Sequence, residues 1–190
     1  MAYTVKDVFY LSTSVQLDAT TGGGAGQLDL SAYIDPIARG RTKGTGLAVY
    51  KAHFAVQQAA SNSDPIDDAE SGTFRYGLVA GAGLGDFATG TANMSSTVFD
   101  NTNALLIQSG SFFGPKSHIA NANTTASMFP NTDIMPSTEV PYVIVRDNVG
   151  LLYQVDDSMV NVTTLSVRLE VAQISLDQAT LNQLLRTQTV

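Results

Sequence analysis

The chain has 190 residues, a formal net charge of −7, no cysteine and no tryptophan. This length is enough for one domain with a substantial core. The lack of cysteine excludes a disulfide framework, a thiolate zinc site and a cysteine nucleophile, and the acidity argues against the basic footprint that broad nucleic-acid binding requires.

Only 14% of the residues are charged, so Ser, Thr, Asn, Gln and Gly must cover most of the surface. Charged residues are depleted at the cores of protein interfaces, so this composition favours a protein whose surface contacts other subunits. It also fits secreted adhesive β-proteins. No segment reads as a signal peptide, and no apolar run reaches the ~18 residues of a membrane-spanning helix.

Alternation of apolar and polar residues with a period of two predicts the first strands. Residues 8–18 form one such run, and residues 19–26, which are rich in Gly and Thr, predict a flexible turn. A short strand begins at Leu28, and residues 36–46 predict a loop. The second long strand covers residues 47–58, and one of its ends is apolar on both faces. Its expected core face consists of Ala48, Tyr50, Ala52, Phe54 and Val56.

The second half of the chain contains more strands and one long irregular stretch. Residues 73–80 alternate as a strand, whereas residues 81–128 predict a long loop excursion with short strands in it. Residues 142–145 and 151–155 predict a hairpin with a five-residue loop. The longest alternating run, residues 163–174, predicts a strand with neighbours on both sides.

The C-terminal end is predicted to be a helix over about residues 175–187. Ser175 and Gln178 have the spacing of a capping box, with Ser175 as the N-cap. Leu181, Leu184 and Leu185 form an apolar stripe. Because a helix of about 13 residues is not stable alone, this stripe is expected to dock on the helix's own sheet or on a neighbour.

Together these elements predict an all-β protein, an antiparallel β-sandwich with one short C-terminal helix. A single domain over residues 1–190 is expected. Roughly eight strands without alternating helices favour the eight-stranded jelly-roll form of the sandwich.

Residues with catalytic chemistry are sparse. His53 and His118 are the only histidines, and no Gly-x-Ser-x-Gly nucleophile elbow occurs. We therefore predict no enzymatic activity and no cofactor.

Two clusters of charge are candidate binding sites. Asp64, Asp67 and Asp68 are candidate ligands for a hard cation such as calcium, although solvated surface acids are the simpler interpretation and no metal is predicted. The basic residues Arg39, Arg41 and Lys43 are candidates for contact with a neighbouring subunit or a phosphate.

The pattern resembles that of small viral coat proteins with a jelly-roll fold. The residues that carry the resemblance are Phe9–Leu17, the stretch from Leu28 to Ile34, Leu47–Gln58, and Leu165–Val171 with the helix after it. The resemblance implies a capsid subunit that self-assembles into an icosahedral shell. It also implies a virion protein that is made in the host cytoplasm and has copies of itself and other virion proteins as partners.

The first residues depart from many coat proteins. Met-Ala-Tyr-Thr-Val-Lys does not form the Arg/Lys-rich arm with which many coat proteins condense RNA. No direct sequence-specific nucleic-acid binding is therefore expected, and an internal membrane is a candidate partner.

Two alternatives remain open from the sequence. The first is a carbohydrate-binding or adhesive β-sandwich module, which tyrosines spared on one open face would favour. The second is a spike, tail or decoration protein of a virion, which shares the same composition.

Overall fold

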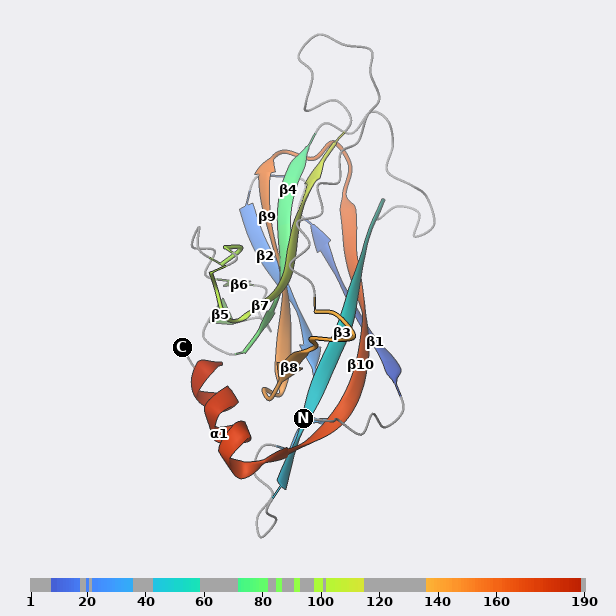
Figure 1. The fold of residues 1–190 in the computed structure, drawn as a ribbon. Coiled ribbons are helices and arrows are strands. Elements are labelled where there is room, and N and C mark those ends of the chain that lie inside the picture. The colour runs from blue at the N-terminus through green and yellow to red at the C-terminus, as the bar shows by residue number, and fades with distance from the viewer. Residues whose placement is uncertain are drawn as a thin grey trace.

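The computed structural model describes residues 8–17, 20, 22–35, 43–58, 72–81, 85–86, 91–92, 98–100, 102–114 and 136–188. Within them, two four-stranded antiparallel sheets face each other (Figure 1). The first sheet has the order β1 (Phe9–Leu17), β10 (Thr163–Asp177), β3 (Lys43–Gln58) and β8 (Tyr142–Ile144). The second has the order β2 (Gly22–Asp29), β9 (Asn148–Asp157), β4 (Thr73–Ala80) and β7 (Leu106–Phe113).

Two minor strands and one helix complete the described elements. The strands β5 (Gly85–Asp86) and β6 (Thr91–Ala92) come between β4 and β7 along the chain and pair with each other as a separate small sheet. Helix α1 (Gln178–Thr187) follows β10. In the described part of the chain, no helix is long and apolar enough to cross a membrane.

The strand order is that of a jelly roll. Along the chain, the eight main strands alternate between the two sheets, except that β4 and β7 are neighbours in one sheet. The predicted eight-stranded sandwich with a C-terminal helix is therefore confirmed. The predicted hairpin at residues 142–155 is wrong, because β8 pairs with β3 whereas β9 pairs with β2 and β4 in the opposite sheet.

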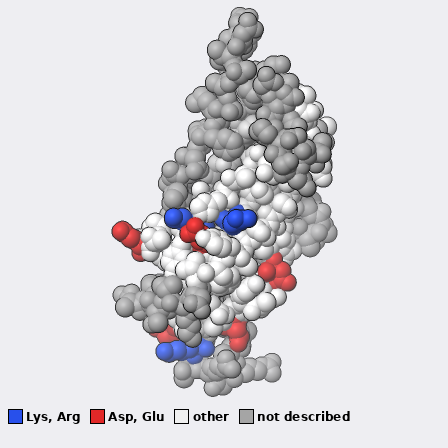
Figure 2. Space-filling view, turned by 90° about the vertical axis from the view of Figure 1, so that its right-hand side faces the viewer, with Lys and Arg blue, Asp and Glu red and all other residues white. Residues whose placement is uncertain are grey.

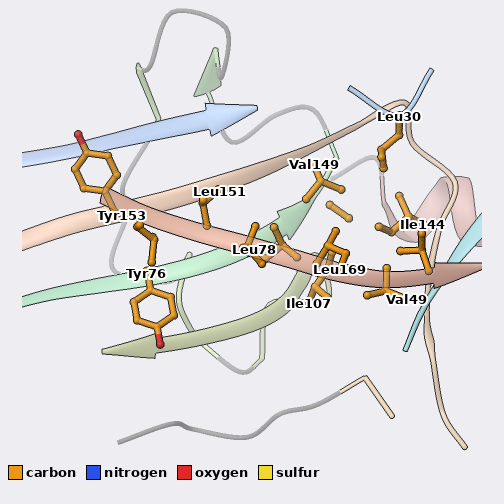
Figure 3. Packing of buried hydrophobic residues seen from close by; sticks show 14 of the residues in the cluster. Leu30, Val49, Tyr76, Leu78, Ile107, Ile144, Val149, Leu151, Tyr153 and Leu169 are labelled. Carbon is orange, nitrogen blue, oxygen red and sulfur yellow. The ribbon is translucent and has the colours of Figure 1, made fainter. Parts of the chain in front are cut away.

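The core lies between the two sheets. Leu165, Val167, Leu169 and Val171 of β10 are at most 1% exposed, as the alternation predicts. Figure 3 shows how labelled aliphatic residues from both sheets, such as Leu151 and Leu169, meet in the space between them. Each fully buried side chain of this size contributes about 1.5–3 kcal/mol to folding.

The predicted glycine-rich turn over residues 19–26 is wrong, because the residues from Gly22 onward form strand β2. Its Gly24 lies directly opposite Tyr153 of β9, and a Cβ at Gly24 would lie 2.5 Å from the Tyr153 hydroxyl oxygen. The glycine is needed because the tyrosine ring lies across the strand at this point. Glycine, which usually indicates a turn, here allows the tyrosine ring to lie close to the backbone of β2.

Strand β3 begins at Lys43, four residues before its predicted start, because residues 43–46 pair with β10 and do not form the predicted loop. Of its predicted core face, Ala52, Phe54 and Val56 pack against the core, whereas Ala48 and Tyr50 do not. Lys51 pairs with Glu170 and Val49 with Val171, so that Tyr50 between them is an extra residue in the ladder, a β-bulge. Because of this extra residue, Leu47 and Val49 point into the core together with Phe54, whereas Ala48 and Tyr50 point to the outer side. Residues 47–50 are all buried, which confirms that this end is covered on both faces.

Helix α1 covers that outer side. Leu181 is buried, and Leu184 and Leu185 pack at the edge of the same cluster. The helix docks on these residues of the first sheet and its margin: Ala48, Tyr50, Val145, Ala172, Ile174 and Leu176. The predicted capping box is wrong, because β10 continues to Asp177, whose carboxylate accepts a 2.7 Å hydrogen bond from the Thr180 N–H as the N-cap.

Candidate functional site

The outer face of the first sheet has two halves that differ in character. The half that contains Ala48 and Tyr50 of β3 is apolar and covered by α1, whereas the half formed by the residues of β3 after Tyr50 is polar and open to solvent. Because successive side chains of a strand point to opposite sides, each open strand contributes every second residue. We call this surface the open face, and it consists of Tyr10, Ser12, Ser14, Lys51, His53, Ala55, Gln57, Ser166, Arg168 and Glu170.

The strand register arranges the open face in rows across β1, β10 and β3. One row is Tyr10, Glu170 and Lys51, and the next is Ser12, Arg168 and His53. Most of these residues line one shallow groove. Figure 2 views this side of the molecule and shows a largely uncharged surface with basic and acidic side chains next to each other near its middle.

One contact between a histidine and a carboxylate crosses the open face. The His53 Nε2 lies 3.1 Å from the Glu170 Oε1, and the two side chains are 53% and 22% exposed. At this exposure an ion pair contributes little to stability. Arg168, in the same row as His53, has no carboxylate within 4.0 Å among the described residues, so its guanidinium is available for an external contact.

Tyr10 is the aromatic residue of the open face and is 63% exposed. By contrast, Tyr50, Tyr76 and Tyr153 are buried, and burial raises the pKa values of Tyr76 and Tyr142 to about 12. The open face thus offers a single tyrosine beside hydroxyl and amide groups, and not a broad aromatic platform.

The outer face of the second sheet is covered by part of the predicted 81–128 excursion. Val98 and Leu105 are buried against Ala25, Val79 and Leu152. Arg75 forms a two-point ion pair with Asp156, at 2.8 Å for both hydrogen bonds, which raises the arginine pKa further. This face therefore has fewer polar groups free to bind a partner.

The sequence-predicted sites are only partly within the described structure. Arg39, Arg41, Asp64, Asp67, Asp68 and His118 lie outside the described residues. Lys43 is exposed at the start of β3, opposite Asp177, and far along the strand from the open face. Among the described residues, no group of three or more His, Asp or Glu side chains could hold a metal ion.

Sequence reasoning did not single out the open face as a site. Its residues are spread over positions 10–14, 51–57 and 166–170, and only the register brings them together. The available signal was that polar residues occupy the outward positions of three separate alternating runs.

Comparison with known proteins finds matches among solved structures. No family model matches the sequence, and no curated protein matches it. The structure of Merkel cell polyomavirus VP1 in complex with disialyllactose matches with 6% identity and a TM-score of 0.39, over 93% of this chain and 99% of that chain. Apo New Jersey polyomavirus VP1 matches with 8% identity and a TM-score of 0.38, over 90% and 100% of the two chains.

Both matched structures are polyomavirus VP1 proteins, at low sequence identity and with TM-scores below 0.5. At these scores the matches carry no conclusion about the fold or the function of this chain. The jelly-roll assignment itself rests on the strand order of this chain.

Proposed function

We propose that this chain is a structural subunit of a virus particle and assembles with copies of itself into a closed, icosahedral shell. The observation that carries the proposal is the complete eight-strand order of two facing sheets. This double-sheet jelly roll is typical of viral capsid and lectin domains. The protein would act in the virion after synthesis in the host cytoplasm.

The interior and the surface support a role in assembly. The space between the sheets is filled by apolar side chains in the described part of the chain, so contacts with partners must use the surface. Few residues of the chain are charged, and the open face carries hydroxyl, amide and aromatic groups beside Lys51, Arg168 and Glu170. Such a surface costs less to desolvate than one rich in Lys and Glu. Copies of itself are the first partners, and other virion proteins and an internal membrane are further ones.

The experiment is light scattering of the purified chain over a range of concentrations, followed by electron microscopy of the same sample. Closed shells, or rings of five or six subunits, are expected. A chain that stays monomeric at every concentration and is absent from the shell of purified virions would contradict the proposal. If the chain occurs in virions but outside the shell, it is a spike, tail or decoration protein.

A carbohydrate-binding module is the second candidate, and the exposed Tyr10 in the groove of the open face favours it. Aromatic rings bind sugars by stacking, and Ser12 and Arg168 in the adjacent row could supply hydrogen bonds beside it. A glycan-binding screen with the wild type and Tyr10→Ala tests this function. Binding that the variant loses would support it, and a screen without any binding glycan would contradict it.

A further inference from the structure

The two edges of the first sheet differ in how they are protected. The β8 edge has only three residues, and the Gln188 side chain bonds to it through the Val145 N–H and the Val143 carbonyl, at 3.2 and 2.7 Å. The β1 edge pairs with β10 on one side. On its other side, the Thr13 hydroxyl donates a 3.3 Å hydrogen bond to the Gln27 carbonyl of β2, but within the described residues no backbone hydrogen bond joins β1 to another strand there.

Strand β1 also lacks the devices that usually protect an edge. Proteins block free edges with charged residues, prolines or bulges. The sequence Phe-Tyr-Leu-Ser-Thr-Ser-Val-Gln-Leu contains no charge and no proline, and its nine-residue register with β10 has no shift. It is therefore a ready template for another strand.

The inward side chains of β1 are incompletely covered. Phe9, Leu11 and Val15 face the core but are only half-buried, whereas the β10 residues opposite them are at most 1% exposed. Apolar surface left partly exposed at an edge favours burial by a further strand.

The β1 sequence is complementary to itself in an antiparallel register centred on Thr13. In that register Phe9 lies opposite Leu17 of a second copy, and Leu11 lies opposite Val15. On the outer side, Ser12 lies opposite Ser14 and Tyr10 opposite Gln16. Core residues therefore meet core residues, and polar residues meet polar ones.

Exposed apolar side chains flank both ends of the strand. Val8 and Tyr10, at its start, are 50% and 63% exposed. Val162, beside the end of β1 because Thr163 pairs with Leu17, is 43% exposed. The antiparallel pairing would bring the start of β1 in one copy next to the end of β1 in the other. Val8 and Tyr10 of one copy would then lie at the same end of the joined sheet as Val162 of the other.

We infer that the β1 edge pairs with β1 of a second copy, around a two-fold axis at Thr13, to form one continuous eight-stranded sheet. This inference rests on the proposed function for its role, as one of the contacts by which subunits assemble. One strand pair buries less than the ~1,200 Å² of a stable interface, so the isolated dimer is expected at high protein concentration.

Cysteine cross-linking tests the register directly, because the natural chain has no cysteine. Directly opposite residues in an antiparallel pair have Cα atoms about 4.5–5.5 Å apart, which is within disulfide range. A mixture of Ser12→Cys and Ser14→Cys chains should therefore form a disulfide dimer on mild oxidation. Either variant alone should form little, because residue 12 is not opposite its own copy. Equal cross-linking of the mixture and the single variants would overturn the register.

Charge at the edge is the second test. Ser12→Lys/Ser14→Lys places Lys opposite Lys twice and should weaken the dimer about tenfold. Mixing it with Ser12→Glu/Ser14→Glu should restore a mixed dimer. The control Asn182→Lys/Gln183→Lys adds the same charge on exposed positions of α1 and should not weaken the dimer. Unchanged dimerisation of the first variant, with an unchanged melting temperature, would overturn the inference.

These results separate the two proposals. If the mixed cysteine variants form shells but do not cross-link on oxidation, the β1 contact is overturned and the shell function is not. Cross-linked dimers without higher assembly in the electron microscope would support the β1 contact and contradict the shell function.

Discussion

Four residues cross the second sheet in one row, in which Gly24, Tyr153, Tyr76 and Gly110 lie opposite one another on β2, β9, β4 and β7. The two tyrosine side chains point in opposite directions (Figure 3), and each ring lies over the glycine of the neighbouring strand. Two bulky rings therefore fit in one row because both outer positions lack a side chain.

This row predicts the effect of adding a single methyl group. Gly24→Ala would place Cβ 2.5–2.8 Å from atoms of the Tyr153 ring, and overpacking of this kind costs about 1–3 kcal/mol of unfolding free energy. Gly110→Ala should cost a similar amount because of Tyr76. Denaturant unfolding measures both, with the exposed Gln27→Ala on β2 as the control. In Gly24→Ala/Tyr153→Leu, the smaller side chain at position 153 should leave room for the added methyl group. The double variant should therefore lose less unfolding free energy than the sum of the two single changes, and a loss equal to that sum would contradict overpacking by the tyrosine.

A second residue, Asp177, predicts an effect of pH. Its backbone hydrogen bond from Thr180 lowers the pKa of the carboxyl below 3.8, with a smaller contribution from the charge of Lys43. Because the folded pKa is the lower one, the stabilising effect of the cap is present above about pH 3.8 and disappears as the pH falls through the folded pKa. The Thr180 amide should thus titrate below pH 3.8 in NMR spectra. In Asp177→Asn, which keeps an N-cap without a charge, this titration should vanish, and a persisting titration would refute the assignment.

At the scale of elements, strands with regular alternation could be predicted from the sequence. Strand β1 and residues 163–171 of β10 follow the period of two because one of their faces is buried in the core, whereas β4 is buried on both faces from Tyr76 onward. The orientation of residues 47–50 of β3 could not be predicted, since a single extra residue at Tyr50 reverses it, whereas the predicted core face holds after the bulge. Local patterns do not contain a bulge, which depends on the neighbouring strand.

Long-range pairing accounts for the other errors. The β8–β9 segment has the sequence of a hairpin, yet each strand belongs to a different sheet. The helix starts later than the capping box suggested because Ser175 is still paired with Thr45 in the β10–β3 ladder. The open face could not be predicted for the same reason, because it exists only in the register of three distant strands.

The end of α1 and the edge of β8 are joined by Gln188, which is 3% exposed. Besides its two side-chain bonds to β8, its carbonyl accepts a 3.1 Å hydrogen bond from the Arg146 Nε. Gln188→Met should cost about 1–3 kcal/mol, because it leaves the Val143 carbonyl and Val145 N–H without this partner. Hydrogen exchange of the Val145 amide should accelerate in parallel. Gln183→Met, at an exposed position of the same helix, should leave both quantities unchanged, and an equal effect of the two changes would contradict a role in protecting the edge.

At the scale of the whole molecule, the net charge of −7 sets the response of assembly to salt. Copies that all carry this charge repel one another, whereas the proposed β1 contact contains no charged residue. Raising the ionic strength from 0.01 to 0.1 M shortens the screening length from about 30 to 10 Å. The protein concentration needed for assembly should therefore fall with added salt. Light scattering at several NaCl and KCl concentrations measures it, and both salts should act alike.

A variant with less net charge tests whether repulsion is the cause. Glu139→Gln/Asp147→Asn changes two exposed acids and reduces the net charge from −7 to −5. This variant should assemble at a lower protein concentration in 0.01 M salt and show a weaker dependence on salt. If salt instead raised the concentration needed for assembly, attraction between opposite charges would hold the subunits together. The uncharged β1 edge would then not be the dominant contact.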